Sequence, residues 1–276
     1  MYDSFQADRL IDFWLHEDIG QFDLTAQLML DEDAISTFHM VAREPMIIAG
    51  IKVAERVFTR YDDRLKVTVL VKDGDHANKG DRLLTVSGPS RSIVTAERPA
   101  LNILQRLCGI ATETARYCKE VEGTKARLLD TRKTTPGLRM LEKHAVTCGG
   151  GLNHRLGLDN GVMLKDNHIA IAGSIGKAVE RVRKHLPALT KVEVECDRLD
   201  QVAEALAAGA DVIMLDNMSL EDMRTAVKTV NGAAKVEASG GINIKTIREV
   251  ALTGVDFIST SKITQAAPAV DIGLDE

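Results

Sequence analysis

The sequence has 276 residues, of which 45% are hydrophobic and 27% are charged, and its net charge is -5. A chain of this length can bury a full-sized core as one large domain, or as one large and one small domain. The acidic balance argues against general nucleic-acid binding, which depends on neutralising many phosphates, and 4% aromatic residues provide few stacking platforms for single strands.

Cysteine usage and the N-terminal segment indicate a cytoplasmic protein. Cys108, Cys118, Cys148 and Cys196 form no CxxC pair and have no zinc-ligand spacing, so we expect reduced, buried thiols. No apolar run approaches the ~18 residues of a membrane span. Residues 1–20 are acidic and amphipathic, unlike a signal or transit peptide. We therefore expect no membrane partner.

The first part of the chain predicts a helix followed by a β-rich region. Apolar side chains recur at near-helical spacing over residues 7–17. From about Ser36 the pattern changes to short apolar runs separated by Gly-Asp turns: FHMVAR, MIIAGI, LKVTVLV and LLTVSG. Residues 71–88 also have some likeness to half of a biotinyl or lipoyl carrier fold, with Lys79 as the attachment point. A β-sandwich with similar turns explains them better, because Lys79 lacks the tight hairpin of a carrier lysine.

A long helix and then an alternation of strands and helices follow. Residues 99–121 place Leu101, Leu104 and Leu107 on one helix face. The candidate strands after it are 127–130, 162–165, 191–195, 212–216, 235–238 and 256–259. The last four end about 21 residues apart, the length of a compact βα unit, and a GxGxxG turn is missing. An α/β barrel with polar residues converging at its C-terminal rim is therefore favoured over a doubly wound sheet.

The segment 130–168 concentrates positive charge in this acidic chain. It contains Arg132, Lys133, Arg139, Lys143, Arg155, Lys165, three histidines and a run of three glycines. Fixed cations and bare backbone N–H groups suit a small molecule with several negative charges. Arg139 and Lys143 lie four residues apart on a predicted helix, where solvation or pairing with a neighbouring acid explains them as well. The polar context of His154 fits a ligand contact as well as simple packing, and His168 could orient Lys165.

Polar residues at the ends of the later strands predict the rest of a site. Glu195 and Asp216 end successive strands, and two such carboxylates suggest Mg²⁺ bridged to phosphate or hydroxyl oxygens; a buried ion pair with the cations is the alternative. Glu193 points to the same side as Glu195 because strand side chains alternate, so it shares the site or lies deeper. Ser239-Gly240-Gly241 follows a strand and is a natural phosphate cradle, since glycine admits close backbone approach.

Taken in order, these motifs resemble the quinolinate phosphoribosyltransferase family. The similar segments are HEDIGQFDLTA, ERPALNILQRLCGIAT, the 130–168 block, EVE, GADVIMLDNM, EASGGI, TGVDFIS and VDIGL. The resemblance covers nearly the whole chain. It implies an α/β protein of the type II phosphoribosyltransferase fold: an N-terminal mixed α/β sandwich domain (1–105), on which the tail 268–276 packs, and a C-terminal incomplete α/β barrel (106–267). It also implies a homodimer with a shared active site.

The resemblance further implies an activity and a set of site residues. The family transfers the phosphoribosyl group of 5-phosphoribosyl-1-pyrophosphate to quinolinate with Mg²⁺ and loss of CO2, giving nicotinate mononucleotide and pyrophosphate in NAD biosynthesis. Lys165, Glu195 and Asp216 match catalytic residues, and the two acids also match the metal site, directly or through substrate or water. Arg98 matches an arginine lent by the partner subunit. The remaining substrate-binding positions are Thr131, Arg132, Lys133, His154, Arg155, Ser239, Gly240, Gly241, Ser259, Thr260 and Ser261.

The last phosphate loop departs from the family's pattern, and two related enzymes remain as alternatives. Residues 259–265 read STSKITQ, where the family commonly has Ser-x-Gly and then Leu-Thr-His-Ser. Ser261 replaces a glycine, and Lys262 offers a charge in compensation. The first alternative is a paralogue of the same fold found beside molybdate transport systems, which tends to lack the Lys165–His168 segment. The second is a nicotinate phosphoribosyltransferase, whose substrate carries fewer carboxylates and needs fewer cations.

Overall fold

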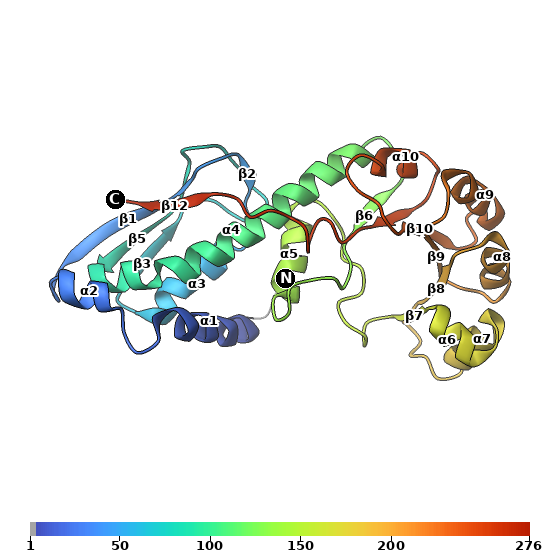
Figure 1. Ribbon diagram of the computed structural model, residues 1–276, viewed down its shortest axis with the longest axis horizontal. Coiled ribbons are helices and arrows are strands. Elements are labelled where there is room, and N and C mark those ends of the chain that lie inside the picture. The colour runs from blue at the N-terminus through green and yellow to red at the C-terminus, as the bar shows by residue number, and fades with distance from the viewer. Residues whose placement is uncertain (1–3) are drawn as a thin grey trace. The chain divides into compact units, whose positions relative to one another are not determined.

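The computed structural model describes residues 4–276, which form two compact units. The first unit contains the chain up to residue 115, residues 135–150 and residues 266–276; the second contains residues 116–134 and 151–265. The expected boundary at 105/106 falls inside helix α4 (Ser90–Val121), which begins in the first unit and ends in the second. The two units are therefore interleaved in the sequence, as the colours of Figure 1 show.

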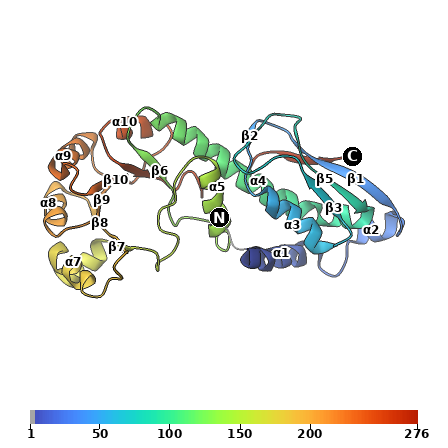
Figure 2. The same cartoon turned by 180° about the vertical axis from the view of Figure 1, so that it is seen from behind.

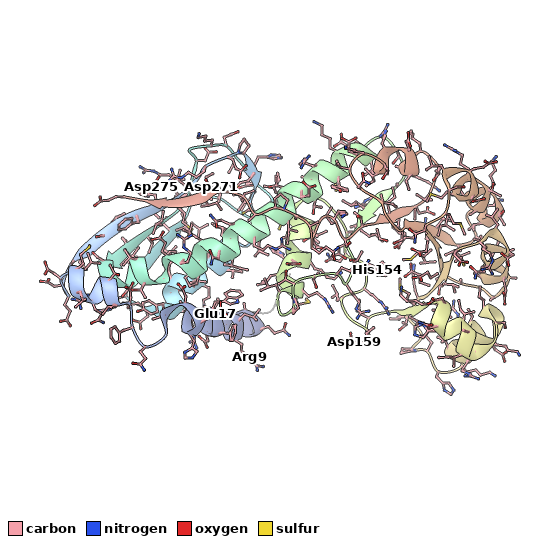
Figure 3. All side chains as sticks on the ribbon, in the orientation of Figure 1. Arg9, Glu17, His154, Asp159, Asp271 and Asp275 are labelled. Carbon is pink, nitrogen blue, oxygen red and sulfur yellow. The ribbon has the colours of Figure 1, made fainter. Side chains whose placement is uncertain are left out.

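The first unit is built on a four-stranded antiparallel sheet in the order β12-β1-β5-β3. Its strands are β1 (Ile35–Ala42), β3 (Lys66–Val69), β5 (Arg82–Pro89) and β12 (Ile272–Asp275). The short strands β2 (Met46–Ile47) and β4 (His76–Ala77) pair separately. Arg43, directly after β1, pairs with Asp275 of β12, which Figure 3 labels. The C-terminal segment thus completes the edge of a sheet begun near the N-terminus.

The same unit also contains four whole helices and the first part of α4. The four are α1 (Ser4–Ile19), α2 (Leu24–Met29), α3 (Ile51–Tyr61) and α5 (Arg139–Cys148). Two ion pairs join α1 to α3, since Arg56 binds Asp8 and Arg60 binds Asp12. Figures 1 and 2 show α3 and α4 alongside the sheet. Phe58 of α3 is completely buried there. The sheet and these helices therefore enclose the core of the unit.

Helix α4 begins at Ser90 rather than at Pro99, where the apolar pattern predicts its start, and Pro99 lies in its interior. A proline inside a helix lacks a backbone N–H and costs about 3 kcal/mol. Ile93, Ala96 and Ala100 on either side of it are completely buried. Tertiary packing of these side chains outweighs the lost hydrogen bond, so the helix continues through the proline.

The second unit is a six-stranded parallel sheet in the order β6-β11-β10-β9-β8-β7. Its strands are β6 (Arg127–Leu129), β7 (Val162–Leu164), β8 (Val192–Cys196), β9 (Val212–Asp216), β10 (Lys235–Ser239) and β11 (Phe257–Ser259). All six predicted strands are confirmed to within one residue at each end. Because β6 and β7 are its edges, the sheet forms the predicted incomplete barrel rather than a closed one.

Helices cover the outer face of this sheet, as Figures 1 and 2 show. They are α6 (Asp166–Ala172), α7 (Ile175–Arg183), α8 (Leu199–Ala207), α9 (Leu220–Val230) and α10 (Ile247–Ala251). Alternation along β8 separates three completely buried apolar residues from Glu193 and Glu195, which point to the inner face. The register places Met214 of β9 beside Glu195, and Glu237 of β10 beside Met214. The inner face therefore carries acidic residues from alternate strands.

The cysteines are free thiols with no sign of activation. Burial raises the pKa of Cys108, Cys148 and Cys196 to about 12, so these thiols stay protonated at neutral pH. Within residues 4–276, no helix combines the length and the apolar character that a bilayer crossing requires.

Candidate active site

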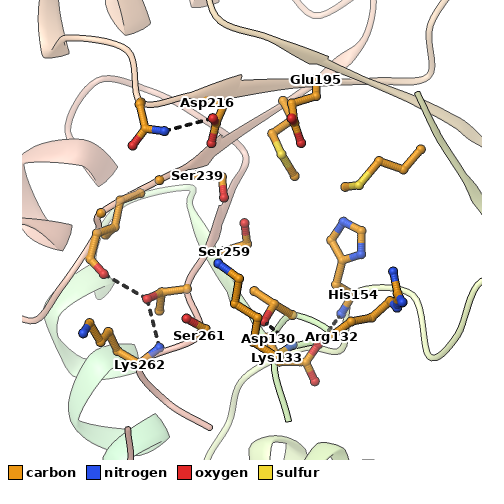
Figure 4. Close-up of a pocket in the computed structure, with 18 of the residues that line it drawn as sticks. Asp130, Arg132, Lys133, His154, Glu195, Asp216, Ser239, Ser259, Ser261 and Lys262 are labelled. Carbon is orange, nitrogen blue, oxygen red and sulfur yellow. Dashed lines mark hydrogen bonds between the residues drawn. The ribbon is translucent and has the colours of Figure 1, made fainter. Parts of the chain in front are cut away.

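The second unit contains a cavity of about 650 Å³ at the carboxyl ends of its strands, a size typical of a small-molecule site. The basic side chains that line it are Arg132, Lys133, Arg155, Lys165 and Lys262. The carboxylates that line it are Asp130, Glu195 and Asp216. All the predicted site residues except Arg98 line this cavity. Figure 4 shows Glu195 and Asp216 on one side and Arg132, Lys133 and His154 on the opposite side.

A buried carboxylate fixes the loop that carries His154. Asp130 follows β6 directly and is completely buried. One of its oxygens accepts the backbone N–H of His154 at 2.8 Å, and the other accepts the side-chain amide of Asn153 at 2.7 Å. Leu152 forms a parallel bridge to Leu129 beside it. Sequence reasoning noted Asp130 only as the polar end of a strand, whereas the structure makes it the anchor of the loop.

The basic side of the cavity is held by one local and one long-range hydrogen bond. The backbone N–H of Lys133 donates to the hydroxyl of Thr131 at 3.0 Å, and the hydroxyl of Thr264 donates to the Lys133 carbonyl at 2.9 Å. Burial lowers the pKa of Arg155, and the nearby charge of Arg132 lowers it further. An arginine stays charged under these conditions. The lowered pKa therefore marks positive charge crowded into a partly buried place, which an anion would relieve.

Lys165 and Glu195 form an ion pair at the ends of neighbouring strands. Lys165 precedes α6, and its Nζ lies 2.5 Å from Glu195 Oε2. The Lys165 backbone N–H donates to His168 Nδ1 at 3.0 Å, so His168 orients Lys165, as the sequence suggested. Glu195 is less exposed than Lys165, with 18% of its side chain accessible against 43%. The pair leaves the lysine ammonium at the solvent side of the cavity.

The turn after β10 is packed against the loop that follows β9. The amide of Asn217 donates to Asp216 at 2.9 Å, and the backbone N–H of Asn217 donates to the Ser239 carbonyl at 3.0 Å. Gly240 has φ +93°, and a Cβ there would lie 2.3 Å from the side-chain oxygen of Asn217. Asn217 itself has φ 55°, a conformation that asparagine tolerates better than most residues. Sequence reasoning missed Asn217, although its place after the strand-ending Asp216 was a usable signal.

A hydrogen bond connects the loop after β11 to the turn after β10. The Thr260 hydroxyl donates to the Ile242 carbonyl at 2.9 Å and accepts the backbone N–H of Lys262 at 3.2 Å. The Thr260 backbone N–H also donates to the Leu129 carbonyl at 3.2 Å, so Ser261 and the Lys262 side chain are left to meet a ligand. Lys262 was not among the predicted site residues. It lines the cavity at the loop where Ser261 replaces a glycine.

A second layer lies beneath the cavity. His154 Nε2 is 3.0 Å from Glu193 Oε2 and 3.7 Å from Glu237 Oε2. Both glutamates are buried. Burial, and next the charge of Glu193, raise the pKa of Glu237 to about 8. Glu193 therefore lies deeper than Glu195, one of the two placements predicted for it.

Three cations named in the sequence analysis lie outside this cavity. Arg98 is on the part of α4 that belongs to the first unit, has a half-exposed side chain, and lies 3.8 Å from Glu97. Arg139 and Lys143 are on α5 in the first unit, where Lys143 is buried. The dense basic segment is thus divided between the two units.

Comparison with known proteins covers both units. The model of the quinolinate phosphoribosyl transferase N-terminal domain matches residues 23–108, and that of the C-terminal domain matches residues 110–275. A probable nicotinate-nucleotide pyrophosphorylase (carboxylating) of Synechocystis sp. is 43% identical over 95% of this chain and 89% of its own length.

Solved structures agree with the sequence comparisons. NadC of Streptococcus pyogenes has a TM-score of 0.96 and 40% identity, over 100% of this chain and 98% of the other. The nicotinate-nucleotide pyrophosphorylase of Francisella tularensis has a TM-score of 0.94 and 42% identity, over 100% and 97%. With both domain models matched and relatives of this similarity along its whole length, the chain belongs to the quinolinate phosphoribosyltransferase family.

Proposed function

We propose that this enzyme transfers the phosphoribosyl group of 5-phosphoribosyl-1-pyrophosphate to quinolinate and releases CO2, giving nicotinate mononucleotide and pyrophosphate in NAD biosynthesis. The observation that carries the proposal is the division of charge across the cavity, with basic side chains facing Glu195 and Asp216. Quinolinate is a dianion and the ribosyl donor is more negative still, so a neutral cavity of this size would not hold both.

The basic side is suited to the two carboxylates of quinolinate. Arg132 and Arg155 offer planar guanidinium groups that match two oxygens at once, and Lys133 offers a compact charge. Holding both carboxylates fixes the plane of the ring and aims its nitrogen at the sugar. Once that nitrogen is quaternised, it stabilises the electron pair left by the departing CO2 on the adjacent carbon, which then takes up a proton from solvent. The protein then mainly has to position the ring.

The opposite side is suited to the ribosyl donor. The Ser239–Gly241 turn and Ser261 in the loop after β11 offer backbone N–H groups and hydroxyls to phosphate oxygens. Departure of pyrophosphate leaves positive charge on the sugar, which Glu195 and Asp216 are placed to stabilise electrostatically. Lys165, paired with Glu195, keeps that carboxylate in place and adds a cation near the reacting groups.

The same acids fit Mg²⁺ by their chemistry. Mg²⁺ prefers carboxylate and phosphate oxygens, and is usually held by one or two carboxylates together with substrate phosphates. Asp216 and the Glu195 oxygen not engaged by Lys165 would hold it, directly or through water. When bound, the ion neutralises charge on the leaving pyrophosphate.

The proposal includes a homodimer in which Arg98 completes the site of the partner. Two observations support it: Arg98 is exposed and does not line the cavity of its own chain, and α2 and its flanks expose apolar side chains. These are Phe22, Leu24, Leu28 and Met29, a patch typical of an interface.

We also place the enzyme in the cytoplasm, where its free thiols stay reduced.

The test is direct. Purified protein supplied with quinolinate, 5-phosphoribosyl-1-pyrophosphate and Mg²⁺ should release CO2 and form nicotinate mononucleotide in equal amounts. If nicotinic acid is used equally well and quinolinate is not, the assignment fails. For the dimer, Arg98→Ala and Lys165→Ala should each have little activity alone and regain activity when mixed, through hybrid dimers. Absence of any regained activity would argue against a shared site.

A further inference from the structure

A cluster of three polar side chains lies beneath the proposed quinolinate side of the cavity. His154 lines the cavity, whereas Glu193 and Glu237 are buried on β8 and β10. Oε1 of each glutamate is buried, and Glu237 has Ser259 and Glu193 within hydrogen-bonding reach. Buried carboxyl oxygens are costly unless they are paired, so the protonation of this cluster calls for an explanation. Figure 3 labels His154 on the loop that carries it.

Neighbouring hydrogen bonds determine which nitrogen of His154 carries the proton. The backbone N–H of Arg155 donates to His154 Nδ1 at 2.8 Å, so Nδ1 must present a lone pair. The proton then sits on Nε2 and is donated to Glu193 Oε2 at 3.0 Å. The ring is therefore neutral, with both nitrogens engaged by the protein. Because Nε2 carries the proton, this nitrogen has no lone pair to bind a metal ion.

The charge of the cluster follows from its burial. Glu237 faces Glu193 from β8 and His154 from the loop after β6, and a neutral histidine cannot balance two carboxylate charges. Carboxylate oxygens of Glu193 and Glu237 lie within 4.8 Å of each other, and two buried carboxyl groups this close do not both ionise. Glu193 accepts the histidine N–H and lies near the charge of Arg155. Glu237 is then the protonated member, in line with its raised pKa.

We propose that Glu193 and Glu237 are positioning residues: Glu193 accepts the Nε2–H of His154 and, with protonated Glu237 beside it, holds the ring as the neutral Nε2–H tautomer, and His154 fixes the backbone of Arg155 beneath the quinolinate carboxylates. His154 then transfers no proton during the reaction. For its kinetic consequences this role rests on the proposed function, but the tautomer and the protonation of Glu237 are properties of the protein without substrate.

Nitrogen-15 NMR of histidine-labelled full-length protein tests the tautomer without any substrate. The His154 signals, identified by their loss in His154→Gln, should be those of the neutral Nε2–H form across pH 5.5 to 7.5. A His154 that titrates to imidazolium near the ordinary histidine value of about 6.5 would overturn the proposal. So would a metal ion present at one per chain in the purified protein and lost on replacing Glu237. These results stand even if quinolinate proves not to be the substrate.

Kinetics test the positioning role. Glu193→Ala should raise the KM for quinolinate about tenfold or more, with a smaller effect on kcat and on the KM for the ribosyl donor. Glu193→Gln should recover much of this loss, because its carbonyl oxygen still accepts the histidine N–H. Glu249→Gln, the same chemical change at an exposed position of α10, is the matched control. Equal loss for both substrates, or no recovery in Glu193→Gln, would contradict the role.

The pH profile tests the proton on Glu237. In the unaltered enzyme the KM for quinolinate should rise above about pH 8, as Glu237 ionises and repels Glu193. Glu237→Gln replaces the protonated acid by a neutral group of the same shape, so its KM should lack this rise. An unchanged alkaline rise in Glu237→Gln would refute the assignment. If this variant folds poorly, the His154 NMR signals of the unaltered protein provide the test instead. They should change above pH 8 over the same pH range as the KM for quinolinate.

Discussion

Replacing Gly240 with alanine should damage the turn that follows β10 more than an ordinary glycine substitution would. The backbone of Gly240 has φ +93°, and a Cβ would lie 2.3 Å from the side-chain oxygen of Asn217 and 2.8 Å from its backbone nitrogen. A left-handed backbone costs an L residue ~1–2 kcal/mol, and overpacking against a fixed neighbour costs ~1–3 kcal/mol. We therefore expect the free energy of unfolding to fall by about 2–5 kcal/mol.

Activity should fall together with stability, because the added Cβ would meet the backbone nitrogen of Asn217 as well as its side chain. Moving Asn217 disturbs its hydrogen bond to the Ser239 carbonyl and shifts Asp216, the residue before it. We expect kcat/KM for the ribosyl donor to fall by about tenfold or more, which corresponds to ~1.4 kcal/mol of transition-state stabilisation. Steady-state kinetics with each substrate varied in turn, and urea unfolding, measure the two effects.

Gly232→Ala is the matched control. Gly232 follows α9 with φ +79°, and a Cβ there would meet no atom within 4 Å. It therefore carries the backbone cost of ~1–2 kcal/mol without the clash, and it does not line the cavity. The difference between the two variants isolates the contact with Asn217. If Gly240→Ala loses no more stability than Gly232→Ala and keeps its activity, the turn is not packed as described and the reasoning fails.

Three further outcomes are expected. Arg106→Ala removes the guanidinium 2.9 Å from completely buried Glu142, and should cost about 3 kcal/mol or more in urea unfolding; an unchanged midpoint would contradict this. The hydrogen bond from Arg64 lowers the pKa of Asp62 below its usual 3.8. Ionised Asp62 therefore stabilises the folded state fully above that pH, and this stabilisation is lost on acidification. In Asp62→Asn the melting temperature should depend less on pH below pH 4 than in the unaltered protein. Lys165→Ala should lower kcat about a hundredfold, whereas exposed Lys228→Ala on α9 should not.

Much of the second unit could be predicted because its signals are local. Apolar runs separated by helical patterns located the six strands, and alternation along β8 put Glu193 and Glu195 on one face. Polar strand ends therefore indicated where a site would lie. The start of α4 could not be predicted in the same way, because Pro99 predicts a boundary locally and only the tertiary burial of its neighbours overrides it.

The roles that the sequence did not indicate depend on contacts with residues far away in the chain. Asp130 fixes the His154 loop, more than twenty positions later, and Asn217 is defined by its contact with Gly240. Lys143 could be read only as a helix residue near an acid, yet it is buried. No spacing rule within one segment shows such contacts. The assignment of individual residues to quinolinate, ribosyl donor and Mg²⁺ remains a prediction for the experiments above.

The open edges of the incomplete barrel have a consequence for how such a site can diversify. In a closed barrel every strand is paired on both sides, so no gap separates two edge strands. Here β6 and β7 share no ladder, and the long connection between them supplies Arg132, Lys133 and Arg155. Outside the Leu152 bridge to β6, insertions or charge changes in that connection leave the pairing of the six strands intact. The connection between the two edge strands is therefore where the enzyme could adapt to a ligand of different charge. Glu195, Asp216 and the turns that follow β10 and β11 would stay as they are.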